Sequence, residues 1–376
     1  MDIKIPVSTL QEVVNKLSVV VKMNTDDVTS MMLIDATGED VKFSATNVST
    51  NMTMTIDDCT VDKKGKVLLR LVDIKRYVNK FTQLSGGYGT DNFRVLIDKN
   101  AGQLKTKTLF ESGSPAYRTL KFAVYNTGLF PNIKGFGEAS LIINSNILKE
   151  GLEKVMGCVN PGEIRIAMSG VYIMIDKDKM TFVGTNGIKL SESILTINGD
   201  IDGKDFILKH DIAAVLRAVL PLNSQVFMYF EDRYVYVSCN NIYVNGTLII
   251  NETYPNYKSA ITTYDKTLSV PKYDIADSVS AAAEVLDPED NNRLTVEFRG
   301  NTFNLKNDRV DIVHELDDEF EYELDVDVNG FYFLSLLNDM SGEYLDVCFK
   351  EDNNTVIFKP RNEDGHTSLI TTVRRR

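Results

Sequence analysis

The sequence repeats one pattern of strands and helices three times, at a spacing of about 120–140 residues. Each repeat opens with a short strand that is followed by an amphipathic helix. These pairs span residues 3–5 and 8–20, residues 141–143 and 146–156, and residues 268–270 and 274–285. Because a repeated pattern requires each unit to bury the same face in the same way, it predicts three similar domains rather than one large core.

A second strand and helix recur later in each repeat. The strands span residues 68–70, 206–208 and 326–328, and the helices span residues 72–81, 211–219 and 331–337. Apolar residues recur three or four apart in these helices, as Ile74, Tyr77, Val78 and Phe81 do. A hairpin follows each helix, within residues 93–109, 225–238 and 345–359. We therefore predict an α+β fold of three domains, 1–136, 137–260 and 261–376, in which helices cover one face of antiparallel sheets.

The stretch 168–191 lies at the centre of the second repeat. Its apolar run 171–175, charged residues 176–179 and second run 180–183 predict a β-hairpin with a charged turn. The chain leaves this hairpin through Thr185-Asn186-Gly187-Ile188-Lys189-Leu190, and Thr46-Asn47 holds the equivalent place in the first repeat. Large apolar side chains in a glycine-bearing loop either fill a core or form a surface cleft for a partner peptide, and the residues alone leave both open.

The composition is that of an ordinary globular protein, with 43% hydrophobic and 25% charged residues among 376. No apolar run approaches the length of a membrane span, and Met1-Asp2-Ile3-Lys4 opens directly into a strand pattern rather than a signal peptide. We therefore expect a cytoplasmic protein with no membrane partner. Its four cysteines, Cys59, Cys158, Cys239 and Cys348, are isolated from one another and from histidine, which predicts reduced thiols and no metal site.

The negative charge of the chain is concentrated in the third repeat. Residues 261–376 contain 12 basic and 25 acidic residues, whereas the preceding residues contain 29 basic and 28 acidic ones. This acidity predicts a solvated surface, or one that steers nucleic acid away from the third domain.

No pattern of residues points to catalysis. His210, His314 and His366 are far apart, and the sequence has no common motif for a nucleophile, a zinc site or a phosphate loop. The glycines at 86, 87 and 89 follow a helix, so a flexible connection explains them better than a phosphate site. The acidic residues of 317–323 are typical of a solvated charge run. We therefore expect no enzyme activity, no metal and no cofactor.

Two motifs and the threefold repeat carry a resemblance to a known family. After its hairpin the second repeat reads Thr185-Asn186-Gly187-Ile188-Lys189-Leu190, and near its end Tyr254-Pro255-Asn256-Tyr257-Lys258. The bacterial β sliding clamp, the processivity factor of replicative DNA polymerases, has Thr-Asp-Gly-His-Arg-Leu and Phe-Pro-Asp-Tyr-Arg at these places. The sequence resembles that family over essentially its whole length. Ile188 replaces the family's histidine and residues 369–376 replace its apolar C-terminus, a divergence that suits a clamp for a distinct polymerase, such as that of a phage.

The resemblance implies a ring of six domains, formed by a head-to-tail homodimer, with the helices lining a channel for duplex DNA. The ring tethers the DNA polymerase, is placed on DNA by a clamp loader, and contacts phosphates without reading sequence. The basic residues expected to face DNA are Lys16, Lys22, Lys75, Arg76, Lys80, Lys149, Lys154 and Arg217. Taken singly, each of them also fits a solvated helix face, and the third repeat's helices carry almost no basic residues.

The resemblance also implies a hydrophobic cleft between the second and third domains, which binds a short peptide of the polymerase or the loader. Its expected residues are Met168, Thr185, Gly187, Ile188, Lys189, Leu190, Pro255, Tyr332, Leu369, Ile370 and Val373. Within it, Lys189 is expected to place a charge at the rim. The dimer interface is expected where Leu104 and Thr106 meet Val285 and Leu286 across paired sheet edges.

Two alternatives remain compatible with the residues. A trimeric clamp with two domains per chain uses the same chemistry, but three repeats in one chain favour the dimer. A β-rich viral structural or binding protein would also lack catalytic motifs.

Overall fold

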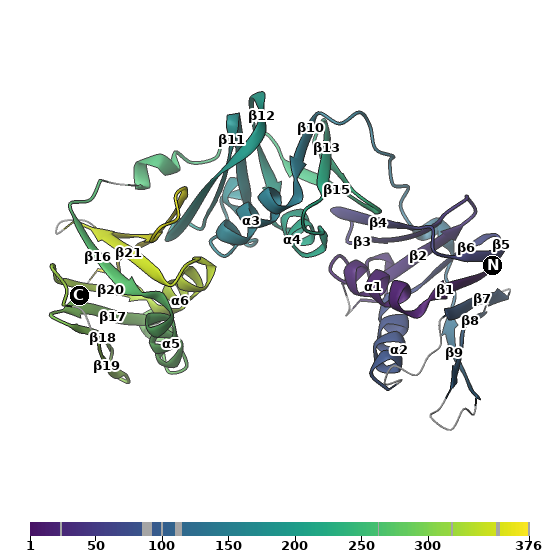
Figure 1. The fold of residues 1–376 in the computed structure, drawn as a ribbon, viewed down its shortest axis with the longest axis horizontal. Helices are drawn as coiled ribbons and strands as arrows, with labels where there is room; N and C mark the ends of the chain where they lie inside the picture. Colours follow the sequence, from purple (N-terminus) through teal and green to yellow (C-terminus); the bar gives the residue numbers. More distant parts are fainter. Residues whose placement is uncertain are drawn as a thin grey trace. The chain divides into compact units, whose positions relative to one another are not determined.

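The computed structural model describes residues 1–22, 25–84, 92–98, 101–109, 115–261, 263–316, 319–350 and 354–374 (Figure 1). The glycines at 86, 87 and 89 and the acidic pair at 317–318 lie outside these residues. The chain forms two compact units. Unit 1 contains Met1–Asn146 and Ala214–Leu248, and unit 2 contains Ile147–Ala213 and Ile249–Arg376. The predicted domain boundaries therefore stay a prediction, since the second repeat contributes to both units.

Unit 1 contains a five-stranded sheet and a larger sheet, with a pair of helices. The five-stranded sheet has the order β5 (Thr60–Lys63), β1 (Asp2–Pro6), β7 (Asn92–Asp98), β8 (Ala101–Leu109) and β9 (Pro115–Ala123). Helices α1 (Val7–Leu17) and α2 (Leu71–Leu84) pack against each other. Helix α1 buries Leu10, Val13, Val14 and Leu17, because residues three and four apart share one face of a helix.

The larger sheet of unit 1 joins strands of the first and second repeats. The first repeat contributes β6 (Gly65–Arg70), β2 (Met31–Ala36), β3 (Val41–Thr46) and β4 (Thr50–Ile56), and the second contributes β15 (Ile242–Ile249), β14 (Tyr234–Cys239), β13 (Gln225–Glu231) and β10 (Leu141–Asn144). Strands β4 and β15 pair in antiparallel register from Thr50 opposite Gly246 to Met54 opposite Ile242. Backbone hydrogen bonds therefore run from one repeat into the next.

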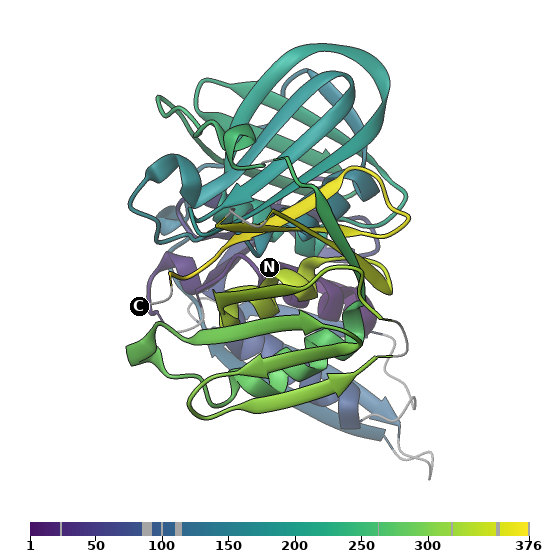
Figure 2. The same ribbon diagram turned by 90° about the vertical axis from the view of Figure 1, so that its left-hand side faces the viewer.

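Unit 2 has a corresponding arrangement. One sheet has the order β16 (Lys266–Pro271), β21 (Tyr344–Phe349), β22 (Thr355–Pro360), β23 (His366–Thr371), β12 (Lys189–Lys209) and β11 (Gly170–Thr185). A second sheet has the order β19 (Asp311–Glu315), β18 (Thr302–Lys306), β17 (Arg293–Arg299) and β20 (Leu324–Asn329), and lies against helices of its unit (Figure 2). The helices are α3 (Ser145–Met156), α5 (Lys272–Ala283) and α6 (Gly330–Asp339), and α4 (His210–Val219) follows β12.

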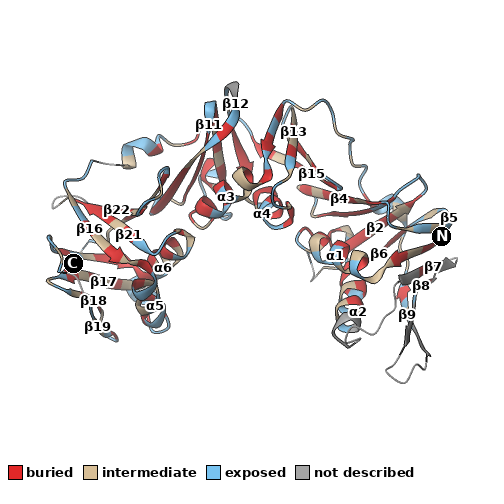
Figure 3. Ribbon diagram, in the orientation of Figure 1, coloured by how far each residue is buried: buried red, intermediate tan, exposed pale blue. Residues whose placement is uncertain are grey.

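The core of the third repeat lies between its sheets and the helix pair α5 and α6. Phe298 and Phe303 of the four-stranded sheet and Phe333 of α6 are fully buried in one apolar cluster. More and less buried positions alternate along β17 and β18 (Figure 3), as expected for a sheet with one covered face. Strands β3, β4, β22 and β23 each contain at least three consecutive buried residues, so both of their faces are covered there. Short 3-10 helices lie at Val28–Ser30, Thr127–Leu129, Ile166–Ser169, Tyr257–Ala260 and Pro288–Asp290.

The α+β class and the recurrence of two helices in each repeat are confirmed. The hairpin predicted for residues 171–183 is wrong, because β11 is one continuous strand of 16 residues. Its charged residues 176–179 do not form a hairpin turn. They form an exposed irregularity, in which Lys177 has a φ of 55° and the register against β12 shifts on both sides. Strand β12 has extra residues opposite this irregularity, and the two strands are paired on both sides of it.

The loops after β3 and β11 have the same hydrogen bonds. In the first, Thr46 Oγ1 accepts from the Val48 amide at 3.0 Å, and Asn47 Oδ1 accepts from the Thr50 amide at 2.7 Å. In the second, Thr185 Oγ1 accepts from the Gly187 amide at 3.1 Å, and Asn186 Oδ1 accepts from the Lys189 amide at 2.9 Å. The equivalence of these two loops is therefore confirmed.

The central residue of each loop is held in the left-handed region of backbone space. Gly187 has a φ of 84° and Val48 has a φ of 79°. Glycine adopts this conformation freely, whereas a β-branched side chain is strained in it. Val48 is also 75% exposed, so apolar burial does not offset that strain.

Replacing Val48 with glycine should therefore stabilise unit 1. Relief of strain is worth about 1–3 kcal/mol, and the greater backbone freedom of glycine in the unfolded chain costs about 0.5–1 kcal/mol. We expect the midpoint of chemical unfolding to rise, with a net gain of about 1 kcal/mol. The matched control, Gly187→Val, should lower the midpoint. A lower midpoint for Val48→Gly would show that Val48 is not strained.

Candidate partner-binding site

The loop Thr185–Leu190 connects β11 to β12 and lies next to an apolar core that β12 and β23 both help to form. Leu190 pairs with Leu369 in the strand register, and both side chains are buried in a cluster with Tyr254. Met168 is also buried. Leu190, Leu369 and Met168, all expected in the cleft, are therefore buried, and Leu190 is a core residue.

Ile188 differs from Leu190 because its side chain is 40% exposed at the tip of the loop. The neighbouring segment, in which Ile164 is 95% exposed and Ile166 is also exposed, was not expected from the sequence. Arg165 lies between them, and a Cβ added to Gly187 would come within 2.5 Å of its Nη2. The loop and this segment are therefore neighbours. We call the side chains of Ile164, Arg165, Ile166 and Ile188 the loop patch.

The prediction that Lys189 places a charge at the rim of the cleft is wrong. Its side chain is buried, its Nζ donates to Ser335 Oγ of α6 at 2.7 Å, and it lies 5.5 Å from the centre of the Tyr332 ring. The long side chain reaches inward because the strand places it on the covered side of the sheet. Lys189 therefore connects β12 with α6.

The remaining residues expected in the cleft belong to different surroundings, since Ile370 and Tyr332 pack in the core of the third repeat rather than with Leu190 and Leu369. Pro255 and Tyr332 are half-buried, and Ile370, fully buried, pairs with Lys189 in the strand register. Val373 is half-buried, and its amide donates to the Asp327 carbonyl at 2.7 Å, which holds the tail after β23 against β20.

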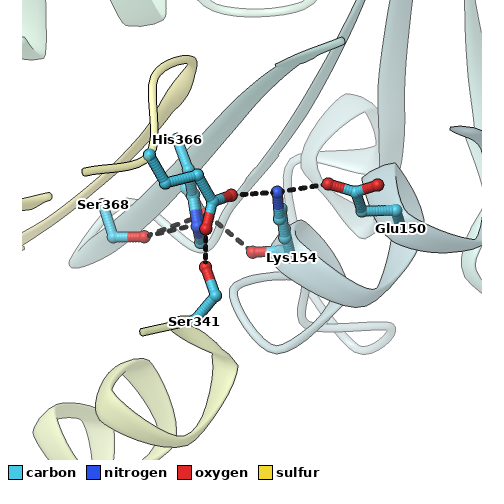
Figure 4. Close-up of polar contacts among 7 residues, drawn as sticks. Glu150, Lys154, Ser341, His366 and Ser368 are labelled. Atoms are coloured by element: carbon cyan, nitrogen blue, oxygen red, sulfur yellow. Dashed lines mark hydrogen bonds and ion pairs between the residues drawn. The ribbon is translucent and has the colours of Figure 1, made fainter. Parts of the chain in front are cut away.

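A buried polar cluster lies on the same two strands, at the register position next to Leu190 and Leu369. Ser191 and Ser368 face each other across the β12–β23 register, with their hydroxyl oxygens 2.9 Å apart, and the His366 Nε2 lies 3.1 Å from Ser191 Oγ. Figure 4 shows His366 and Ser368 of this group beside Lys154 of α3. Ser191 also donates to the Lys154 carbonyl at 2.7 Å, so the cluster connects α3 with both strands.

An ion pair completes the cluster. Lys154 Nζ contacts Glu150 at 2.6 Å and also Glu363, which accepts a hydrogen bond from Ser341. Burial opposes the charge on Lys154, but the hydrogen bonds to Glu150 and Glu363 outweigh it and raise the pKa of the amine. The pKa of Glu363 is lowered, because the hydrogen bonds from Lys154 and Ser341 outweigh its burial. The pair is thus ionised near neutral pH.

Burial lowers the pKa of His366 to about 4, and the positive charge of Lys154 adds to this effect. An unfolded histidine has a pKa of about 6.5. Between these values the unfolded chain binds a proton that the folded chain does not, so folding stability falls as the pH falls. The contribution of His366 is fully present above pH 6.5 and is lost progressively down to about pH 4.

We expect the free energy of unfolding to drop by about 3 kcal/mol between pH 6.5 and pH 4 through this one group. His366→Gln should flatten that dependence, as measured by urea titrations at several pH values. The control His210→Gln, whose ring is partly exposed, should keep the parent slope. An unchanged slope in His366→Gln would show that the imidazole does not control acid stability.

The basic residues expected to face DNA fall into three groups. Lys22, Arg76, Lys80 and Arg217 are exposed, and Lys16, Lys75 and Lys149 are half-buried. Lys16 pairs with Glu12 at 2.7 Å, and Lys75 Nζ donates to Ser18 Oγ at 2.7 Å. Lys154 does not belong in this set, because it is buried in the ion pair with Glu150 and Glu363.

The expected dimer residues also need correction. Leu104 and Thr106 lie in β8, which pairs with β7 on one side and β9 on the other, so it is not a sheet edge. Leu104 is buried, and the side chain of Thr106 is outside the described residues. Leu286 is buried in the core of the third repeat, whereas Val285 is exposed.

Within the described ranges, no three His, Cys, Asp or Glu side chains gather as a metal site. Cys158, Cys239 and Cys348 are buried free thiols, Cys59 is half-buried, and burial raises the pKa of all four. Among the described helices, none combines the length and apolarity needed to cross a membrane.

Comparison with known proteins identifies similar chains. No family model matches the sequence. The chain is 22% identical over 256 residues to the "Beta sliding clamp" of Buchnera aphidicola subsp. Rhopalosiphum padi, covering 65% of this chain and 69% of that protein. It is 23% identical over 257 residues to the corresponding protein of Chlamydia pneumoniae, covering 68% of this chain and 66% of that protein, just under two thirds of its length.

Solved structures extend the likeness to the whole chain. The DNA polymerase sliding clamp of Bacillus subtilis superposes with a TM-score of 0.83 at 15% identity, covering 100% of both chains. The DNA polymerase III β chain of Streptococcus pneumoniae superposes with a TM-score of 0.82 at 17% identity, again over 100% of both. The resemblance to bacterial sliding clamps is confirmed, and the chain has their fold.

Proposed function

We propose that this chain is a DNA sliding clamp, which encircles duplex DNA as a head-to-tail homodimer and tethers a DNA polymerase. The observation that carries the proposal is the full-length likeness in fold to polymerase sliding clamps at only 15% identity. The proposed role is non-catalytic and cytoplasmic. A β-rich binding protein without a ring would need neither this fold nor two helices in each repeat.

Contact with DNA is proposed to be electrostatic and independent of sequence. Arg76 and Lys80 project from α2 with exposed side chains, and Lys22 is exposed beyond the end of α1. A ring that holds DNA topologically needs only weak phosphate contacts along its inner wall. The half-buried Lys16 and Lys75 have partners of their own and are expected to contribute less.

A clamp loaded on nicked circular DNA should stay bound until the circle is cut. Arg76→Glu with Lys80→Glu should weaken binding and reduce the slope of log affinity against log salt by roughly 0.9 for each lost phosphate contact. The control Lys179→Glu, on the exposed irregularity of β11, should leave the slope unchanged. An unchanged slope in the double variant would place α2 away from DNA.

The partner site is proposed to consist of the loop patch and the buried floor formed by Leu190, Leu369 and Met168. Exposed apolar side chains above a buried floor are typical of sites that receive an apolar anchor from a peptide. Arg165 is exposed beside Gly187 and supplies the positive charge that Lys189, being buried, cannot. The expected ligands are short segments of the polymerase and of the clamp loader, bound one at a time.

Ile188→Asp should therefore abolish stimulation of the polymerase while the fold is kept. An anchor contact in such a site is worth about 2 kcal/mol or more, and the exposed position tolerates a carboxylate. Leu190→Asp is the matched control, because it buries a charge in the core and should lower the unfolding midpoint as well. Full stimulation by a folded Ile188→Asp variant would move the partner site elsewhere.

Two sheet edges are proposed to close the ring. In the five-stranded sheet, β5 is short and charged, which leaves the nine-residue β9 as the edge suited to pairing. In the four-stranded sheet, the tail at Val373 hydrogen-bonds to β20, which leaves β19, where Val313 is 61% exposed. Strand β9 carries two basic residues and β19 two acidic ones, so the edges complement each other in charge.

A further inference from the structure

The two linkers between repeats carry the same motif. The first reads Phe130-Pro131-Asn132-Ile133-Lys134 and the second reads Tyr254-Pro255-Asn256-Tyr257-Lys258. Each lies against the sheet of the repeat that it leaves, since Phe130 packs with residues of β2 and β6, and Tyr254 packs with residues of β11 and β12. The linkers can therefore be compared position by position.

The second linker fills the space beneath it with its own side chains. The Tyr254 ring stacks on Tyr172 with a centroid distance of 4.8 Å, and the Tyr257 hydroxyl donates to Glu192 Oε1 at 2.8 Å. Lys258 Nζ lies 3.2 Å from the same carboxylate. Both Tyr257 and Glu192 are buried, so the ring and the carboxylate are internal parts of the second repeat.

The first linker covers a hollow of about 450 Å³ instead. The strand register shows which residues of the two repeats are equivalent. Ser44 lies opposite Thr53, two pairs before Thr46, and Val183 lies opposite Glu192, two pairs before Thr185. Thr53 thus replaces Glu192, and Ile133 replaces Tyr257. Both replacements are smaller, and the hollow is lined by Thr53 and Ile133 together.

Three lysines and Asp35 line the hollow, and among the described residues two of these lysines have an ion-pair partner. Lys134, the equivalent of Lys258, pairs with Glu231. Lys66 pairs with Asp35 at 2.8 Å, and Lys42 is exposed, with no ion-pair partner in the part of the chain that the structure describes. The Ser44 and Thr53 hydroxyls line the hollow, are buried and hydrogen-bond to each other at 2.8 Å, so one of the two keeps a hydrogen that it can donate to an anion.

We propose that the hollow beneath the first linker binds a partner peptide that presents an aromatic ring beside a carboxylate. The ligand supplies the two groups that the second repeat takes from its own Tyr257 and Glu192. The aromatic ring lies against Phe130 and Ile133, and the carboxylate lies near Lys42, Ser44 and Thr53. The volume of about 450 Å³ is within the range of ligand pockets, and mixed apolar and polar walls are typical of them. This site is separate from the loop patch and does not depend on the proposed function.

The test uses the full chain and the blocked dipeptide N-acetyl-Tyr-Glu-amide, followed through the methyl NMR signals of Leu33, which lines the hollow. We expect a saturable shift. N-acetyl-Tyr-Gln-amide and N-acetyl-Ala-Glu-amide should each bind at least fivefold more weakly. The double variant Thr53→Glu with Ile133→Tyr installs the residues of the second repeat and should abolish the shift by filling the hollow.

Lys42→Glu changes an exposed residue and leaves the core intact. It should lower the affinity for the Tyr-Glu dipeptide at least tenfold, whereas the exposed control Lys64→Glu should leave that affinity unchanged. The proposal is overturned if the Leu33 signals do not shift saturably at millimolar peptide. It is also overturned if the Tyr-Glu and Tyr-Gln dipeptides bind with equal affinity, or if the Lys42→Glu variant binds the Tyr-Glu dipeptide as tightly as the parent protein does. The NMR measurement requires neither DNA nor polymerase. Its result therefore tests the peptide site even if the proposed clamp function is wrong.

Discussion

Strand edges with unsatisfied backbone groups are the constraint on which this structure depends. A sheet exposes a row of amides and carbonyls at each edge, and these groups pair with another strand or remain available for one. Within the chain, β4 pairs with β15 and β12 pairs with β23, so each repeat is joined to the next through backbone hydrogen bonds. In the proposed ring, β9 and β19 make the corresponding junction between two copies. The same kind of bond then connects all the repeats.

The junction between β12 and β23 also determines the candidate partner site. Leu190 and Leu369, the proposed floor of this site, pair there, and the adjacent register positions carry Ser191 and Ser368 of the buried polar cluster. Because buried polar groups are costly when unpaired, this cluster favours one register over a slipped one. The polar cluster and Lys189 thus hold the floor in place from two sides, while the exposed loop patch stays free for a partner.

Much of the fold could be predicted from the sequence, because helical periodicity and strand patterning are local. The helix at 211–219, for example, is found as His210–Val219. Burial of long charged side chains was not predictable, since Lys154 and Lys189 find their partners in Glu363 and Ser335, which are distant in sequence. The charged residues 176–179 suggested a turn, because local composition cannot distinguish a turn from an exposed irregularity within a long strand. Arg165 was missed, although its two flanking isoleucines in a loop between glycines were a usable signal.

Closure of a ring by two copies through the β9 and β19 edges is the central requirement of the proposed function. Sedimentation equilibrium of the free protein at micromolar concentration tests this directly. We expect a particle of twice the 42.2 kDa chain mass, which dissociates when proline is introduced in place of Val313 at the exposed edge of β19. A particle of one or three chain masses, or a Val313→Pro variant that remains a folded dimer, would contradict it.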